Sequence, residues 1–279
     1  MTIENRSDPD DFAIRLETDG LVLLPGRPFE LEPYELDLIS PRWSDGRAKN
    51  ISLTAGADVR GATADPLTER RLAGLMTRYR TWAESMIRDL APRYAPRLEL
   101  GRASVRTRDV AEGAESRRKD DRRLHVDAFA SQPTGGKRIL RVFTNVNPDG
   151  EPRVWRVGEP FEAHARRWAG RLRRPAPGEG WLLRQLGVTR STRTPYDALM
   201  LGLHDAAKLD EAYQNAAEAR EMSFAAGATW VAYTDAVVHA AIRGRFMLEQ
   251  TFYLPLEAMA APEAAPARVL ERITGRALA

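Results

Sequence analysis

The stretch 124–129 (Leu-His-Val-Asp-Ala-Phe) and the run 138–146 behind it constrain the fold most. His125 and Asp127 are two residues apart, so on a strand both side chains leave the same face. A turn with Pro133 and two glycines separates this stretch from the long run. The run then predicts a strand with Arg141, Phe143 and Asn145 on one face and Leu140, Val142, Thr144 and Val146 on the other. We therefore expect antiparallel strands that hold an imidazole beside a carboxylate.

The rest of the chain supplies more strands and several helices. Alternating or apolar runs between glycines and prolines predict strands at 12–16, 21–24, 98–106, 152–157, 228–239 and 246–253. Apolar residues at helical spacing predict a packing helix over 67–90, bracketed by prolines. Further helices are expected over 160–186, from Thr194-Pro195 to about 220, and over 262–279.

These elements predict a mainly β fold with flanking helices, built on a two-sheet jelly-roll core (a double-stranded β-helix, cupin-like). We expect residues 1–65 to be an N-terminal strand and loop extension packed on the core. Residues 66–279 would form the main domain, with a helical insertion at about 160–220.

Composition narrows the class of protein. The 279 residues contain no cysteine, so disulfides, thiolate zinc sites and cysteine nucleophiles are excluded. No segment approaches the ~20 apolar residues of a membrane span, and the polar start lacks the apolar core of a signal peptide. A cytoplasmic protein is expected. Nucleic-acid binding is disfavoured because the arginines are not interleaved with aromatic residues in any ordered way.

One imidazole and one carboxylate make half of a metal site, so a second histidine is needed. His164 and His204 lie in helical stretches, where surface or cap roles are expected. His239 ends an alternating strand just before a hairpin, 112 residues after Asp127. His125, Asp127 and His239 would complete the two-histidine, one-carboxylate triad that is typical of non-haem Fe(II) oxygenases.

Here the sequence resembles a known family. His125-Val-Asp127 with a distal His239 is similar to the Fe(II)/2-oxoglutarate dioxygenases, and the segments 124–148 and 152–161 resemble the Kdo 3-hydroxylases. The resemblance spans roughly 100 to 275. Its further matches are Tyr196-Asp197, Leu203-His-Asp205, Asp235 with His239, Leu248-Glu-Gln-Thr-Phe252 and Leu270-Glu-Arg-Ile-Thr-Gly275.

The resemblance implies Fe(II), 2-oxoglutarate and O2 as cofactor and co-substrates. It also implies that a hydroxyl replaces a hydrogen at C3 of Kdo (3-deoxy-D-manno-oct-2-ulosonic acid) in the lipopolysaccharide inner core or Kdo-lipid A. His125, Asp127 and His239 would be the catalytic metal ligands. No catalytic carboxylate pair or Ser-His-Asp arrangement is required, because the cofactor performs the hard step.

The distal carboxylate of 2-oxoglutarate needs a cation, preferably a bidentate arginine. Many relatives place one about ten residues after the distal histidine, where this chain has Glu249, Gln250 and Thr251 instead. Arg106 is the preferred clamp, with Asn145 and Gln250 as supporting donors. Arg141 is assigned to the substrate carboxylate, and Trp155 either walls the pocket or belongs to the core.

A lipid-linked sugar acid at the inner membrane would also favour peripheral contact of the protein with that membrane. Arginine clusters at Arg117-Arg118-Lys119, Arg122-Arg123, Arg166-Arg167 and Arg171–Arg174 are either solvated faces or a surface for anionic groups. The cluster Arg117–Arg123 is the expected contact. Two alternatives stay open: a 2-oxoglutarate dioxygenase acting on another sugar acid or glycolipid, and a metal-free jelly-roll carbohydrate-binding protein.

Overall fold

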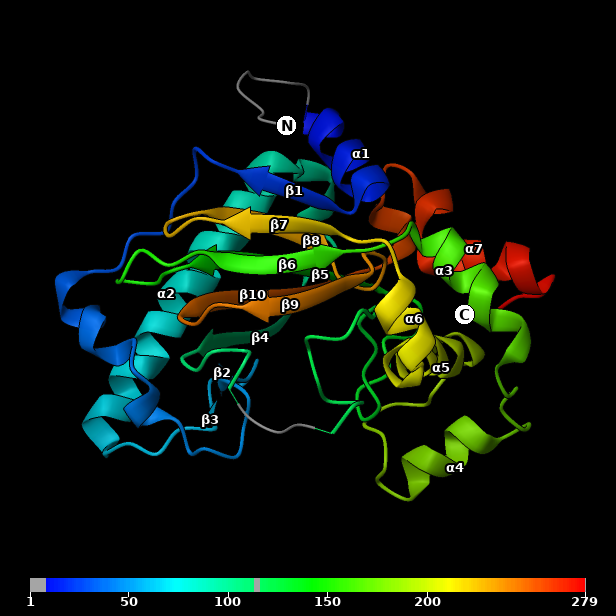
Figure 1. Cartoon of the computed structure of the whole chain (residues 1–279), viewed down its shortest axis with the longest axis horizontal. Helices are drawn as coiled ribbons and strands as arrows, with labels where there is room; N and C mark the ends of the chain where they lie inside the picture. The colour runs from blue at the N-terminus through cyan, green and yellow to red at the C-terminus, as the bar shows by residue number, and fades with distance from the viewer. Residues whose placement is uncertain (1–8, 113–115, 279) are drawn as a thin grey trace.

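The computed structural model describes residues 9–112 and 116–278 of the chain; the remaining residues of the polar start and of the charged connection after 107 lie outside this description. Within it, two antiparallel sheets lie face to face (Figure 1). The larger sheet has the order β1-β8-β5-β10-β4-β2-β3, and the smaller has the order β7-β6-β9. The strands are β1 (Leu21–Leu24), β2 (Ile51–Leu53), β3 (Val59–Arg60), β4 (Glu99–Arg106), β5 (Arg138–Asn145), β6 (Arg153–Val157), β7 (Arg220–Phe224), β8 (Thr229–Tyr233), β9 (His239–Arg243) and β10 (Met247–Leu254).

The two sheets enclose an aromatic cluster. Phe143 from β5 and Trp230 from β8 stack at 5.3 Å, and Trp155 from β6 meets both rings edge-on. Along β5, Leu140 and Val142 point to the face opposite Phe143, away from the smaller sheet, and belong to a second core. The alternation predicted for β5 is therefore confirmed, as is the mainly β jelly-roll fold with flanking helices.

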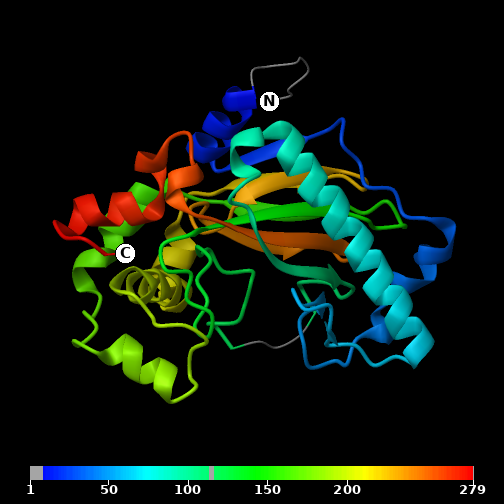
Figure 2. The same cartoon turned by 180° about the vertical axis from the view of Figure 1, so that it is seen from behind.

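Helix α2 (Pro66–Leu90) covers the outer face of the larger sheet (Figure 2). Asp65 caps it by accepting hydrogen bonds from the backbone N–H groups of Leu67 and Thr68, and Pro66 occupies the first turn. Tyr79 in its buried stripe donates to the carbonyl of Val142 at 3.2 Å, which ties the helix to β5. The packing helix predicted over 67–90 is confirmed.

The helical insertion is more broken than its sequence pattern predicted. The single helix expected over 160–186 is two separate helices, because Pro175 and Pro177 interrupt it. The single helix expected from Thr194 to about 220 is also two helices, which end at 209 and 216. Residues 220–224 form β7, which was not predicted. The helices here and at the C-terminus are α3 (Phe161–Trp168), α4 (Glu179–Gln185), α5 (Pro195–Leu209), α6 (Glu211–Ala216) and α7 (Pro266–Thr274).

The N-terminal segment contains a helix where a strand was expected. Residues 12–16 lie in α1 (Pro9–Asp19), so the strand prediction there is wrong. The apolar side chains Phe12, Ala13 and Leu16 share one helical face and are buried. After α1, strands β1 and β2 join the larger sheet beside β8 and β4. The domain boundary at residue 65 stays a prediction.

None of the helices in the described part of the chain combines the length and the apolar character needed to cross a membrane.

Candidate metal centre

The stretch 124–129 is not a strand, which corrects the sequence-based expectation. His125 and His239 instead form an isolated antiparallel bridge, with the N–H of each residue donating to the carbonyl of the other at 3.0 and 2.8 Å. The N–H of Asp127 donates to the carbonyl of Thr234 at 2.7 Å. The backbone thus places both histidines and the aspartate at the end of the smaller sheet where β9 begins.

Backbone carbonyls also set the orientation of both imidazole rings. Nδ1 of His125 lies 2.7 Å from the carbonyl of Arg123, and Nδ1 of His239 lies 2.9 Å from the carbonyl of Val237. A carbonyl can only accept, so each Nδ1 carries the proton and each Nε2 keeps its lone pair. This is the arrangement that metal-binding histidines use.

The three side chains meet in one place. Their potential ligand atoms lie within 4.8 Å of one another, and all three residues are buried. Nε2 of His125 is 3.5 Å from Oδ1 of Asp127. Oδ2 of Asp127 has no hydrogen bond from any residue that the structure describes, although Nη1 of Arg141 lies 3.2 Å away in an ion pair. Two imidazole lone pairs and an incompletely satisfied buried carboxylate fit a divalent metal ion such as Fe(II).

The electrostatics keep the triad in the protonation state that a metal requires. Burial lowers the pKa of His125 to about 4, and burial also lowers the pKa of His239. Burial by itself would raise the pKa of Asp127, but the Arg141 guanidinium and His125 outweigh it and hold that pKa well below its usual range. At neutral pH the site therefore has two neutral imidazoles and one carboxylate.

These pKa shifts predict metal binding that is nearly independent of pH over the usual range. Histidines with an ordinary pKa of about 6.5 would begin to bind protons in competition with the metal below that pH. Here the affinity for Co(II), measured by competition with a chelator of known affinity, should fall less between pH 7.5 and 5.5 than it would for two histidines of ordinary pKa, because burial lowers the pKa of both imidazoles. A decline centred near pH 6.5 would contradict the burial argument.

Aromatic neighbours brace both imidazoles. Trp155 stacks on His239 with ring centres 5.0 Å apart, while it also belongs to the aromatic cluster between the sheets. Trp155 therefore belongs to the core and also contacts a histidine of the triad. His204 on α5 meets His125 edge-on at 5.3 Å but is outside the triad, and His164 is completely buried rather than at the surface.

The three residues assigned to 2-oxoglutarate lie in different environments. Arg106 reaches the interior but is paired: its Nη2 lies 2.8 Å from Asp121, and its Nε donates to Asn50. Asn145 uses both amide N–H groups on the carbonyls of Glu151 and Phe224, so it has no donor left for a carboxylate.

Gln250 lies on the wrong face of β10 for the role assigned to it. Side chains alternate along a strand, and Gln250 shares its face with Leu248 and Phe252, which belong to the core under α2. Its neighbour Glu249 faces the triad instead and lies 3.6 Å from Arg141. The amide of Gln250 donates to the carbonyl of Thr251.

Arg153 is a buried cation for which no role was predicted from the sequence. It is 2 % exposed, and Nη1 donates to the carbonyl of Gly244 while Nε has no hydrogen-bond partner within 9–112 and 116–278. Burial, reinforced by nearby Arg106, lowers its pKa to about 9. Arg153 precedes Trp155 by two residues on β6, so their side chains share a face and their Cα atoms lie about 7 Å apart. This alternation is the feature of the sequence that could have pointed to Arg153.

A cavity opens beside Asp127. It lies between the loop 128–135 and α5, and it is lined by Asp127, Ala128, Phe129, Thr134, Ile139, Tyr196, Asp197 and Met200. Asp197 caps α5 with Thr194 and also accepts hydrogen bonds from the backbone N–H groups of Thr134 and Gly135. The buried carboxylate of Asp197 thus attaches the loop after Asp127 to helix α5 on the other side of the cavity.

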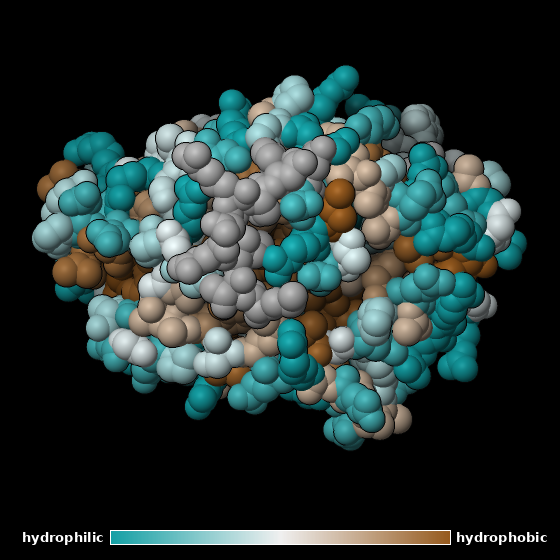
Figure 3. Space-filling model, turned by 90° about the horizontal axis from the view of Figure 1, so that it is seen from above, coloured by the Kyte–Doolittle hydropathy of each residue, from teal (hydrophilic) through white to brown (hydrophobic). Residues whose placement is uncertain are grey.

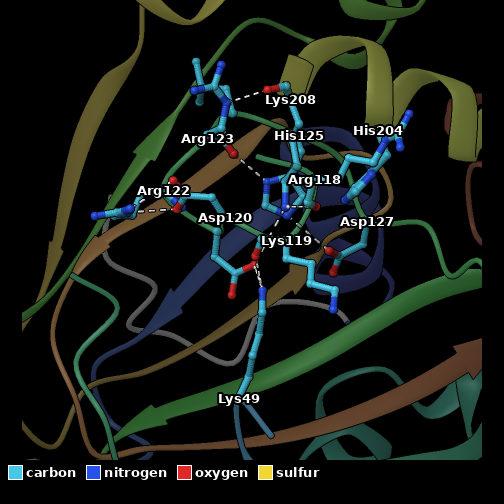
Figure 4. Close-up of polar contacts among 12 residues, drawn as sticks. Lys49, Arg118, Lys119, Asp120, Arg122, Arg123, His125, Asp127, His204 and Lys208 are labelled. Carbon is cyan, nitrogen blue, oxygen red and sulfur yellow. Dashed lines mark hydrogen bonds and ion pairs between the residues drawn. The ribbon is translucent and has the colours of Figure 1, made fainter. Parts of the chain in front are cut away.

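Figure 4 shows the charged connection that leads to His125. Its arginines are paired with carboxylates: Arg117 and Arg123 with Glu211, Arg118 with Asp205, and Arg122 with Asp120. Deeper in, Asp121 binds Lys49 and Arg106. These two cations outweigh the effect of burial and hold the pKa of Asp121 far below its usual range. These pairs hold the connection against α5 and α6 and give each of these four arginines a carboxylate partner.

Comparisons with known proteins identify relatives over the whole length. Residues 2–277 match the family described as 3-deoxy-D-manno-oct-2-ulosonic acid (Kdo) hydroxylase. The structure is similar to that of the Kdo hydroxylase KdoO, a non-haem Fe(II) α-ketoglutarate-dependent dioxygenase, in complex with α-ketoglutarate and Fe(III): the TM-score is 0.93 at 40% identity, over 100% of this chain and 93% of that one.

The same protein with cobalt(II) gives a TM-score of 0.93 at 40% identity, over 100% of this chain and 96% of that one. With succinate and Fe(III) it gives a TM-score of 0.92 at 39% identity, over 100% and 96%. No protein with a curated function matches the sequence.

Proposed function

Because this chain belongs to the Kdo hydroxylase family, we propose that it hydroxylates C3 of Kdo in a Kdo-containing lipid A or lipopolysaccharide precursor, using Fe(II), 2-oxoglutarate and O2. The observation that supports this best is the convergence of His125, Asp127 and His239 within 4.8 Å. When bound, iron with 2-oxoglutarate and O2 supplies the oxidising power that converts C–H to C–OH, with release of succinate and CO2.

The chain's own residues would hold and orient the reactants. We assign His125, Asp127 and His239 as the metal ligands, with each Nε2 and one aspartate oxygen facing the metal. With three protein ligands, a bound metal ion would have coordination positions left for the co-substrates. Trp155 keeps the His239 ring in place by stacking, and the hydrogen bonds to Arg123 and Val237 fix both tautomers.

Arg141 is the proposed anchor for the carboxylate of Kdo. It lies beside Asp127, and its buried Nε has no partner in the protein. In Kdo the C3 methylene is separated from the C1 carboxylate only by C2. A guanidinium next to the metal ligand would therefore hold C3 close to the metal. Glu249, also near Arg141, balances the charge when the site is empty of substrate.

For the distal carboxylate of 2-oxoglutarate, Arg106 stays a proposal and Arg153 becomes a second candidate. Arg106 would have to share its guanidinium with Asp121. Arg153 has no carboxylate within ion-pair distance among the described residues, and it faces the same interior as Trp155. A bound anion would therefore offset the energetic cost of burying its charge.

Replacing the clamp should raise the KM for 2-oxoglutarate selectively. We expect Arg153→Met to raise this KM by about 10- to 100-fold with little change in metal affinity, because a buried charge-assisted hydrogen bond contributes about 1.5–3 kcal/mol. Arg106→Met is the matched comparison. If only Arg106→Met raises the KM for 2-oxoglutarate, Arg106 is the clamp and Arg153 is structural.

The decisive test of the proposed function is succinate release. It should require Fe(II), ascorbate and Kdo-lipid A together, and the lipid product should gain one oxygen on Kdo by mass spectrometry. Activity on a different sugar acid with none on Kdo-lipid A would favour the alternative substrate. Absence of iron binding after anaerobic reconstitution would favour a carbohydrate-binding jelly roll.

The acceptor's lipid anchor also implies a place of action. We propose that the protein works in the cytoplasm at the inner face of the inner membrane. The pairing of Arg117, Arg118, Arg122 and Arg123 with carboxylates makes that cluster a weak candidate for the contact.

A further inference from the structure

Helix α4 and its flanking residues, 171–193, form a projection at the edge of the molecule. Figures 1 and 2 both show α4 standing away from the sheets below α5. None of the residues of α4 is buried. We call residues 171–193 the α4 projection.

The tip of the α4 projection is apolar and uncovered. Trp181 is 58 % exposed, Leu182 50 %, Leu186 67 % and Val188 51 %. Leu182 and Leu186 are four residues apart and so lie on one side of the helix. Four large apolar side chains within eight residues make no contribution to a core, and such clusters mark surfaces that meet a partner or a membrane.

The same projection carries a concentrated positive charge. It contains six arginines and one acidic residue, Glu179, giving a net charge of +5, whereas the whole chain has only +3. The remainder of the chain is therefore slightly acidic. Arg173 pairs with Glu179, but Arg171, Arg174, Arg184 and Arg190 are exposed and have no ion pair among the described residues. This contrasts with the paired arginines of the cluster Arg117–Arg123.

The projection is tied directly to the rim of the candidate site. The N–H of Arg190 donates to the carbonyl of Ser131 at 2.9 Å, and Nη2 of Arg193 donates to the carbonyl of Ala130 at 2.6 Å. Both acceptors lie in the loop that follows Asp127. Gly180 in turn packs so closely on the carbonyl of Arg193 that a Cβ there would lie 1.9 Å from the oxygen. The projection and the site entrance thus form one connected unit.

We propose that the α4 projection is the surface by which the protein docks on an anionic lipid bilayer. Trp181, Leu182 and Leu186 enter the interface between headgroups and acyl chains, where tryptophan is favoured. The unpaired arginines contact lipid phosphates around them. The face seen in Figure 3, on the other side of the molecule, shows hydrophilic side chains interspersed with apolar ones outside the grey atoms. The proposal rests on the proposed function, because a lipid-linked acceptor explains why the site entrance adjoins a membrane-binding surface.

Vesicle flotation tests the proposal without turnover. The full chain should float with vesicles of phosphatidylethanolamine and phosphatidylglycerol, and much less with phosphatidylcholine alone or at high salt. The triple variant Trp181→Ser/Leu182→Ser/Leu186→Ser should reduce the partition coefficient at least about tenfold, and Arg174→Gln/Arg184→Gln should remove most of the preference for anionic lipid.

The matched control removes equally exposed apolar residues from elsewhere. Tyr34→Ser/Leu36→Ser/Leu67→Ser changes side chains that are 64 %, 50 % and 60 % exposed, and it should float like the wild type. The proposal is overturned if the wild type does not bind anionic vesicles, or if both triple variants bind equally well. It is also overturned if the Trp181 triple variant converts a dimer into a monomer in light scattering, since the patch would then be a subunit interface.

Two acceptors separate this proposal from the proposed function. On a water-soluble Kdo saccharide the Trp181 triple variant should release succinate at the wild-type rate, while on Kdo-lipid A in vesicles it should be at least tenfold slower. If neither protein acts on either acceptor, the proposed function fails, but the flotation result still decides the docking surface. Equal loss on both acceptors would show that the substitutions damage the site and would refute docking as their effect.

Discussion

His239→Ala is expected to abolish iron binding and hydroxylation together. The substitution removes one of three ligands while leaving the backbone bridge to His125 intact, because that bridge uses only main-chain atoms. Loss of a group that only hydrogen-bonds to a metal ligand costs about 10- to 100-fold in metal affinity, so loss of a ligand should cost at least about 100-fold. Iron content after anaerobic reconstitution and succinate release with Kdo-lipid A measure the two effects.

His204→Ala is the matched control. His204 touches the ring of His125 at 5.3 Å but lies outside the triad. Its variant should keep its iron and lose less than about tenfold in turnover. A His239→Ala protein that retains iron would disprove the assignment of the triad, as would a His204→Ala protein that loses iron equally.

The second large effect is on stability. Arg138 and Asp235 form an ion pair that is 0 % and 1 % exposed, with Nε 2.8 Å from Oδ2, and the guanidinium lies 3.8 Å from the centre of the Tyr233 ring. Arg138→Met leaves a buried aspartate without its partner, which should lower the free energy of unfolding by about 3–5 kcal/mol. Urea denaturation of the metal-free protein measures this loss.

The loss should depend on pH in a defined direction. Burial already raises the pKa of Asp235 above its ordinary value, and without Arg138 that pKa must rise further. The folded variant then binds more protons than the unfolded chain, so its stability falls as the pH rises. We expect the variant to be less destabilised at pH 5 than at pH 8. Arg138→Met/Asp235→Leu should recover most of the stability, and Arg166→Met, which breaks an exposed pair with Glu162, should cost less than about 1 kcal/mol.

The elements predicted from sequence are those whose pattern is local. Helix α2 shows a long apolar stripe between prolines, and β5 shows strict alternation, so both were predicted closely. The short α1 was mistaken for a strand, because five residues with mixed apolar spacing fit either period. Strand β7 follows the predicted helix and was not predicted, because it is an exposed edge strand with little apolar pattern.

Some features of the candidate site likewise follow from the sequence, and others only from the fold. By itself, the sequence determined which residue types are available: with no cysteine and four histidines, only a few ligand sets were possible, and the His-x-Asp spacing identified two of the three members. Only the tertiary structure decided the environments of the remaining polar groups. In the folded protein Gln250 points away from the triad, and the amide of Asn145 donates to backbone carbonyls. Nε of Arg153 is buried without a hydrogen-bond partner among the described residues.

The physical reason is that hydrogen bonding and charge pairing depend on distances between residues far apart in the chain, whereas periodicity depends only on neighbours. Two arginine-rich segments look alike in the sequence, yet each arginine of the cluster Arg117–Arg123 is paired with Asp120, Asp205 or Glu211, while the α4 projection has one local acid for six arginines.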